Sequence, residues 1–170
     1  LPYLDAPQAV LRMAALAGLR QLGESVIRQR AAALLDDPDM PVRATALVIV
    51  LAESQGPDYA RAYQRWEAML NDPDPGTQMA ALSMMAEVPE TPLQGRVYRA
   101  LDHTQLSVRH TALRVLQQLA LAGRISGLDS ALLRALEADD AESRELALLV
   151  LSALGTGEAL EHMLVLLDDE

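Results

Sequence analysis

The chain has 170 residues, of which 51% are hydrophobic and 3% aromatic, and its formal net charge is −10. This composition excludes a disordered or membrane-spanning chain, so we expect one soluble globular unit. Because cysteine and lysine are both absent, disulfides, zinc thiolate sites and lysine-dependent phosphate loops are excluded as well.

A thirteen-residue pattern recurs along the chain, in which a leucine precedes a polar turn and the sequence Ala-Leu closes the copy. The copies begin at Leu4, Leu35, Leu70, Leu101 and Leu136, and a sixth begins at Leu167. The intervals between these leucines are 31, 35, 31, 35 and 31 residues. A regular period of this length is typical of helical repeat arrays.

Apolar residues recur at helical spacing on both sides of each turn, which predicts a pair of helices per copy. Before the turn, the stripe holds apolar residues one, four and eight positions ahead of the leading leucine, and Trp66 fills one of these core positions. After the turn, Ala46 and Leu47 have equivalents in every complete copy, and a large apolar residue follows three positions later. We expect both helices of each pair to face one continuous core.

The turns carry residues that begin and end helices. Asp39, Asp74 and Asp140 are predicted to be N-caps, and Pro75 suits the first position of a helix. We expect breaks between the helix pairs at Gly23, Gly56-Pro57, 89–92, 123–127 and 155–157.

The segment from Asp37 to Leu47, Asp-Pro-Asp-x-x-Val-Arg-x-x-Ala-Leu, resembles the inter-helix signature of HEAT repeats, including the short bacterial HEAT-like type. The resemblance covers essentially the whole chain, although Thr77 and Gln78 depart from it in one copy. It implies an all-α, right-handed α-α superhelix of about five helical hairpins, with residues 1–170 forming a single HEAT-like domain. It also implies that the chain belongs to a longer array.

An arginine column begins the second helix of most copies and consists of Arg12, Arg43, Arg109 and Arg144. Acidic residues stand in the turns nearby, namely Asp5, Asp36, Asp102 and Glu137. The resemblance to HEAT repeats implies that such residues form a structural ladder of hydrogen bonds between successive turns.

A second set of positions is the candidate surface for contact with a partner. It lies on the second helices away from the predicted core and comprises Ala14, Ala17, Thr45, Val48, Ala80, Ser83, Thr111, Arg114, Leu146 and Leu149. In HEAT-type solenoids such helices line the concave surface, and this row is small and neutral for a solvated face. Tyr59 and Tyr63 form a separate candidate contact, since tyrosine is favoured at binding hot spots.

Residues that could carry chemistry have structural interpretations that we favour. A calcium loop counted from Asp72 would place Ser83 where a bidentate glutamate belongs. His103, His110 and Asp102 could form a metal site but lack a convincing further ligand, so we expect solvated surface histidines. The aligned arginines Arg30, Arg65 and Arg96 could meet phosphate or an acidic partner, but we expect them to pair with nearby acids. We therefore assign no catalytic, metal or cofactor site.

The sequence favours a noncatalytic protein-interaction or scaffold module within a larger, bacterial protein. An alternative is an accessory or regulatory domain of a bacterial membrane transporter or sensor. A HEAT-like DNA glycosylase or bilin lyase is a third interpretation, but a glycosylase needs a basic groove and the row contributes only Arg114.

We expect a protein partner of unknown identity and weak end-to-end self-association. We expect no bound nucleic acid, because an acidic chain repels phosphate. The longest apolar run, residues 46–52, is far below the roughly 18 residues that cross a bilayer. Since no leader or signal core is visible at the start, we expect a cytoplasmic location, either free or as the cytoplasmic part of a membrane-associated protein.

Overall fold

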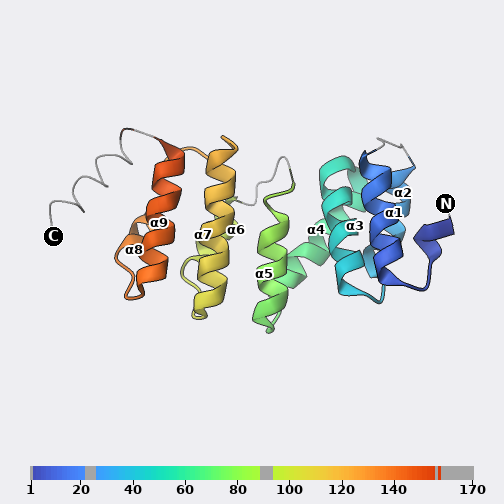
Figure 1. Ribbon diagram of the computed structural model, residues 1–170, viewed down its shortest axis with the longest axis horizontal. Helices are drawn as coiled ribbons and strands as arrows, with labels where there is room; N and C mark the ends of the chain where they lie inside the picture. Colours follow the sequence, from blue (N-terminus) through green and yellow to red (C-terminus); the bar gives the residue numbers. More distant parts are fainter. Residues whose placement is uncertain (1, 22–25, 89–93, 156, 158–170) are drawn as a thin grey trace. The chain divides into compact units, whose positions relative to one another are not determined.

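The computed structural model describes residues 2–21, 26–88, 94–155 and 157. Within these ranges the chain forms nine α-helices, two short 3-10 helices and no strands (Figure 1). The prediction of an all-α fold is therefore confirmed for the described residues. The expected breaks at Gly23 and 89–92 and the sixth copy from Leu167 lie outside them.

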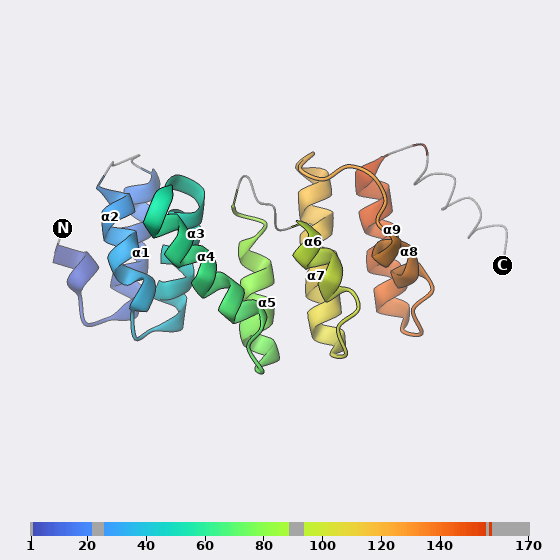
Figure 2. The ribbon, with the colours of Figure 1, turned by 180° about the vertical axis from the view of Figure 1, so that it is seen from behind.

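The helical contacts divide the chain into two compact units, and unit 1 comprises Leu1–Pro73 and Glu87–Glu90. Its elements are η1 (Pro2–Asp5), α1 (Ala9–Gln21), α2 (Ile27–Ala33), η2 (Leu34–Asp36), α3 (Met40–Glu53) and α4 (Gly56–Leu70). Helix α3 packs against α1, α2 and α4. Figures 1 and 2 show α1 and α3 in one layer of this unit and α2 and α4 in the other.

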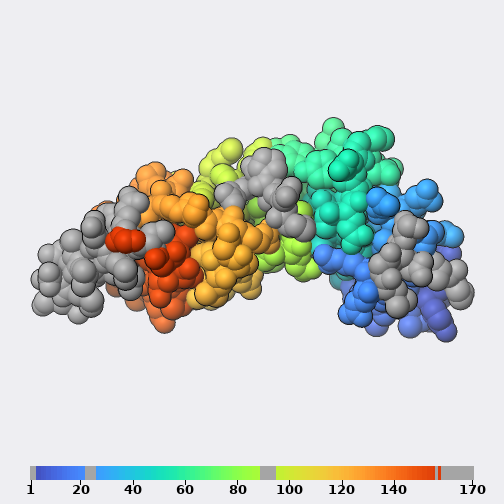
Figure 3. Space-filling view, turned by 90° about the horizontal axis from the view of Figure 1, so that it is seen from above, coloured from blue at the N-terminus to red at the C-terminus, as the bar shows by residue number. Residues whose placement is uncertain are grey.

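Unit 2 comprises Asp74–Ala86 and Thr91–Glu170. Its helices are α5 (Pro75–Met84), α6 (Gln94–Ala100), α7 (Leu106–Leu121), α8 (Ser130–Leu136) and α9 (Ala141–Leu154). Helix α7 packs between α5 and α9, while α6 packs on α7 and α8 packs on α9. The atoms of α7 and α9 lie directly against each other when the molecule is seen from above (Figure 3).

The repeated apolar positions form the core of both units, as the sequence predicts. The alanines of the Ala-Leu pair are fully buried in four copies, at Ala46, Ala81, Ala112 and Ala147. The large residue three positions after the pair is buried in every complete copy, at Leu19, Val50, Met85, Leu116 and Leu151. Trp66 is also fully buried. Small alanines beside large residues let neighbouring helices approach closely, and the buried apolar area stabilises the fold.

The predicted N-cap residues all directly precede a helix, but their side chains bind different partners. Asp74 Oδ2 accepts the Thr77 N–H at 2.8 Å, and Asp140 Oδ1 accepts the Ser143 N–H at 2.8 Å. Pro75 is the first residue of α5, as predicted. Asp39 precedes α3 but its side chain caps no N–H, because it pairs with Arg12 instead. The capping prediction is therefore wrong for the Asp39 side chain.

Helix α7 ends at a glycine whose conformation other residues rarely adopt. Gly123 has a φ of 64°, and its N–H donates to the Ala120 carbonyl at 2.9 Å. The next N–H, of Arg124, reaches back to the Leu119 carbonyl at 2.8 Å. This pair of bonds is a Schellman motif, which satisfies carbonyls that the helix end would leave open. The chain is thereby turned towards α8.

Candidate functional site

Each arginine of the column donates hydrogen bonds to backbone carbonyls of the turn in its own copy. In each case Nη1 donates to the backbone carbonyls six and five residues earlier, at 2.6–2.8 Å and 2.9–3.2 Å. The four arginines are Arg12, Arg43, Arg109 and Arg144. Because a guanidinium offers five donors in a fixed plane, one side chain can hold two carbonyls and still reach a carboxylate.

In unit 1 the Arg12 guanidinium also crosses to the next turn. It donates to both carboxylate oxygens of Asp37, at 2.9 and 2.7 Å, and to Asp39 at 2.6 Å. The Arg12 and Asp37 side chains are only 8% and 4% exposed. The hydrogen bonds from Arg12 hold the pKa of Asp37 below its usual range, against burial, which acts to raise it.

In unit 2 the Arg109 guanidinium makes the equivalent crossing. Its Nη2 lies 3.4 Å from Asp140 Oδ2, and Asp140 stands at the same place in its copy as Asp39 does in unit 1. The predicted ladder between successive turns is therefore present at Arg12 and Arg109.

The acids predicted for the ladder are wrong by one to three positions. Asp36 pairs with Arg65 at 2.6 Å, and Asp102 pairs with Arg134 at 2.7 Å, so both face the following first helix. The ladder instead uses Asp37, Asp39 and Asp140. The Arg65 contact confirms that this arginine pairs with a nearby acid.

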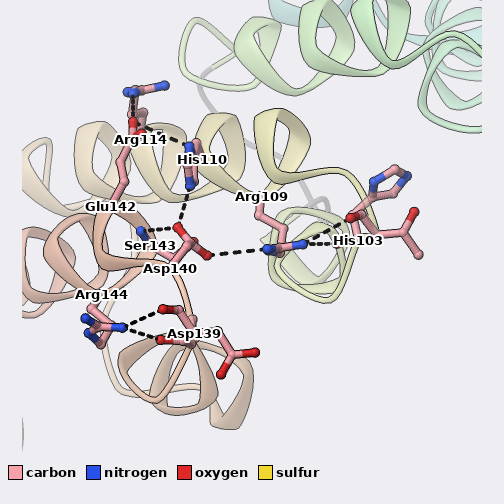
Figure 4. Close-up of polar contacts among 11 residues, drawn as sticks. His103, Arg109, His110, Arg114, Asp139, Asp140, Glu142, Ser143 and Arg144 are labelled. Atoms are coloured by element: carbon pink, nitrogen blue, oxygen red, sulfur yellow. Dashed lines mark hydrogen bonds and ion pairs between the residues drawn. The ribbon is translucent and has the colours of Figure 1, made fainter.

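His110 lies in a cluster that sequence reasoning missed (Figure 4). It is buried, so the expectation of a solvated histidine is wrong there. Its Nε2 lies 3.0 Å from Asp140 Oδ1, and its Nδ1 lies 3.4 Å from Glu142 Oε1. Burial acts to raise the pKa of Asp140, but hydrogen bonds from His110, Ser143 and Arg109 outweigh it and hold this pKa well below its usual range. The spacing of Asp140 and Glu142 on one helix end is the signal that could have revealed the cluster.

The residues of the candidate contact row differ in their exposure to solvent. Ser83, Arg114 and Leu149 are exposed, and Thr45 and Thr111 are half-buried. Val48 is buried, because α3 packs against three helices and residues 46–51 are all covered. Leu146 is buried too, so the prediction of exposure is wrong for Val48 and Leu146.

The hydroxyl groups of the row are occupied within their own helices. Thr45 donates to the Pro41 carbonyl at 3.0 Å, Ser83 to Met79 at 2.9 Å and Thr111 to Ser107 at 2.8 Å. Such bonds compete with bonds to a partner. The row therefore offers methyl groups, Arg114 and Leu149 rather than unpaired hydroxyls.

Helices α7 and α9 together present a wider surface, which we name the α7–α9 stripe. Its members recur every three or four residues and so share one face of each helix. They are Thr111, Arg114, Gln118 and Leu121 on α7, and Glu142, Glu145, Leu149 and Ser152 on α9. Leu121 and Leu149 are 70% and 41% exposed, and Arg114 joins the two helices through Glu142 at 2.7 Å. The predicted row holds only two positions per copy, so it does not include Gln118, Leu121, Glu142, Glu145 and Ser152.

The aromatic candidate lies on α4 in unit 1. The rings of Tyr59 and Tyr63 are stacked with centroids 6.3 Å apart, and Tyr63 lies 5.9 Å from Trp66. Both tyrosines are half-buried, whereas Trp66 is fully buried as predicted. The two tyrosines therefore form a row of contacting rings with the buried Trp66 along one face of α4.

Two cavities, one in each unit, share four positions of the repeat: the leading leucine, the aspartate after it, the arginine of the column and the leucine of the Ala-Leu pair. In unit 1 a cavity of about 210 Å³ lies among Leu35, Asp36, Arg43, Leu47 and Arg65. In unit 2 a cavity of about 110 Å³ lies among Leu101, Asp102, Arg109, Leu113 and Arg134. Apolar and charged side chains line both cavities, and one ion pair lies in each lining, Arg65–Asp36 in unit 1 and Arg134–Asp102 in unit 2. The lining of the unit 1 cavity holds two arginines and two aspartates, whereas that of the unit 2 cavity holds two arginines and one aspartate.

No protein-family model matches the chain, and no curated protein matches it. The part of the chain that the structure describes holds no group of three His, Cys, Asp or Glu residues suited to a metal ion. Nor do these residues include a helix with the length and apolar character to cross a bilayer.

Proposed function

We propose that the chain is a noncatalytic protein-interaction or scaffold module, built as a right-handed HEAT-like solenoid of about five helical hairpins. The repeat pattern supports this architecture. Helix pairs α2–α3, α6–α7 and α8–α9 each pack together and meet at the polar turn of a copy. In each copy that carries the arginine, the same two carbonyls of the turn are held. Repeats of this kind commonly present extended binding surfaces.

The observation that carries the proposed function is the exposed α7–α9 stripe. The residues that recur in every copy form the core and the turns. The residues of the stripe, in contrast, differ in type between copies and face solvent. Leu121 and Leu149 place apolar area on adjacent helices, flanked by Arg114, Glu142 and Glu145. An apolar centre with a charged margin is the usual make-up of a protein interface.

Substitution of Leu149 tests the proposal. We expect Leu149→Asp to reduce capture of a protein partner at least tenfold, since it places a charge in the apolar part of the stripe. Helicity measured by circular dichroism should be unchanged, because Leu149 is already 41% exposed. Capture is measured by quantitative mass spectrometry of proteins retained from a lysate of the source organism.

The matched control is Val10→Asp, which introduces the same charge at an exposed valine of α1 outside the stripe. It should retain the partners of the unmodified chain. Equal retention by the Leu149 and Val10 variants would show that the stripe is not the contact surface.

A further inference from the structure

The hydroxyl group of Ser143 is buried and has no hydrogen-bond partner among the residues that the structure describes. Ser143 is only 1% exposed, and it belongs to the lining of the unit 2 cavity. Its backbone N–H is occupied, since it donates to Asp140 Oδ1 at 2.8 Å. Val42 and Val108 stand at the same position in two other copies and are buried, so a hydroxyl group replaces a methyl group here. A buried hydroxyl group without a partner destabilises a fold, and its presence therefore needs an explanation.

The lining of this cavity contains further hydrogen-bond donors. Arg109 Nη1 binds the carbonyls of residues 103 and 104 at 2.8 and 3.2 Å, which fixes the guanidinium in place. Its Nη2 lies 3.4 Å from Asp140 Oδ2, and its Nε makes no hydrogen bond within the described ranges of the chain. Arg134 already binds both oxygens of Asp102, the acid of the lining, at 3.3 and 2.7 Å. With two arginines and one aspartate, the lining suits an anion that brings acceptor atoms.

Asp140 is a neighbouring acid and opposes a second negative charge. It lies between Ser143 and Arg109 (Figure 4) but does not line the cavity. Its Oδ1 accepts the Ser143 N–H and lies 3.0 Å from His110 Nε2. Because its carboxylate is already bound by these groups, its repulsion weakens the attraction of the two guanidinium groups without cancelling it.

The rest of the lining is apolar and limits the ligand to a small size. It consists of Leu101, Leu113, Ala131, Ala135 and Ala138. A cavity of about 150 Å³ accepts benzene. The volume of about 110 Å³ therefore suits a somewhat smaller ligand, of about four or five heavy atoms.

We propose that the unit 2 cavity binds a short aliphatic monocarboxylate, such as acetate or propionate, between the Ser143 hydroxyl group and the Arg109 guanidinium. The carboxylate accepts a hydrogen bond from each group, and the bond from the guanidinium is charge-assisted. The aliphatic end lies against the leucines and alanines, where it is removed from water. Phosphate fits this lining less well, because several of its oxygens would face apolar side chains without a donor.

Titration of the full chain with propionate, followed by ¹H–¹⁵N NMR at pH 7 and constant ionic strength, tests the site. We expect the amide signals of Arg109 and Ser143 to shift saturably, with a dissociation constant on the order of 1 mM for so small a ligand. Propionamide has the same shape without the charge, and it should bind roughly tenfold more weakly. Inorganic phosphate should also bind roughly tenfold more weakly, for the reason given above.

Two variants remove different parts of the site. Ser143→Ala deletes the hydroxyl group and should weaken propionate binding about fivefold. Ala135→Met fills the cavity and should abolish binding, and a large side chain suits this position because other copies have Leu34 and Met69 there. Ser107→Ala is the matched control, since it removes an exposed hydroxyl group of α7 outside the lining, and it should bind propionate like the unmodified chain. Circular dichroism checks that each variant keeps its helicity.

The absence of a saturable shift up to about 50 mM propionate would overturn the proposal. Unchanged binding in either Ser143→Ala or Ala135→Met would also overturn it, because the propionate would then lie elsewhere. Equal or tighter binding of propionamide or phosphate would contradict a carboxylate as the ligand.

Discussion

At the scale of single residues, the contact between Arg12 and Asp37 is a buried ion pair of unit 1. Asp37 has both carboxylate oxygens bound by Arg12, and Asp37 Oδ1 also accepts the Asp39 N–H at 2.9 Å. Without the Asp37 charge, the buried Arg12 guanidinium keeps only the half-exposed Asp39 as an acidic partner, so much of its charge compensation is lost. We expect Asp37→Asn to lower the free energy of unfolding by about 3 kcal/mol at pH 7.

The pH dependence of this effect has a defined sign. The pKa of Asp37 is lower in the folded state than the value of about 3.9 in an unfolded chain. Its ionisation therefore stabilises the folded state above pH 4, and this contribution is lost as the pH falls through the folded-state pKa. The difference between Asp37→Asn and the unmodified chain should shrink below pH 4.

Urea unfolding followed by tryptophan fluorescence measures both effects, because Trp66 is the single tryptophan and is buried in unit 1. The neighbouring acid provides a control. Asp36 pairs with Arg65, and both side chains are more than half exposed, so Asp36→Asn should cost less than about 1 kcal/mol. A larger loss in Asp36→Asn than in Asp37→Asn would contradict the assignment of the ladder.

At the scale of elements, helix α7 begins with a poor cap. Gln105 occupies the N-cap position and its side chain accepts no N–H, whereas Asp74 and Asp140 cap the equivalent helices. We expect Gln105→Asp to raise the free energy of unfolding by about 1 kcal/mol, the usual gain for a good cap. Amide hydrogen exchange in the first turn of α7 measures it.

A longer acidic side chain separates capping from charge. Gln105→Glu adds the same charge near the helix N-terminus but does not suit the cap, so it should gain less than half of the effect. Equal stabilisation by the Asp and Glu variants would contradict the capping explanation.

The sequence predicts the helical elements well because their signal is repeated. The spacing of the leucines, alanines and turns places the helix pairs, and α3, α5 and α9 begin directly after Asp39, Asp74 and Asp140. The side-chain partners are less predictable. Asp36 and Asp37 are adjacent and chemically identical, and only the path of the backbone decides which one faces Arg12. The burial of Val48 and His110 likewise depends on neighbouring helices, which no periodicity within one helix reveals.

At the scale of the whole molecule, the distribution of charge argues against nucleic acid as the partner. The chain carries a net charge of −10, and three exposed arginines are each 2.6–2.7 Å from a carboxylate, in the pairs Arg65–Asp36, Arg114–Glu142 and Arg134–Asp102. Phosphate binding depends on arginines that release counterions from the nucleic acid. An arginine paired with a carboxylate must first lose that partner, and the surplus of acids repels the backbone.

We therefore expect no saturable binding to a duplex oligonucleotide at 150 mM salt, with a dissociation constant weaker than about 100 µM even at 50 mM salt. Fluorescence anisotropy with a labelled duplex measures this. A variant with Asp36→Asn, Asp102→Asn and Glu142→Gln removes the three paired carboxylates and provides the comparison. If this variant binds while the unmodified chain does not, local pairing is what prevents binding, and if neither binds, the overall charge suffices. Micromolar binding by the unmodified chain, weakening steeply with salt, would contradict both explanations and favour a nucleic-acid partner over the protein partner proposed for the α7–α9 stripe.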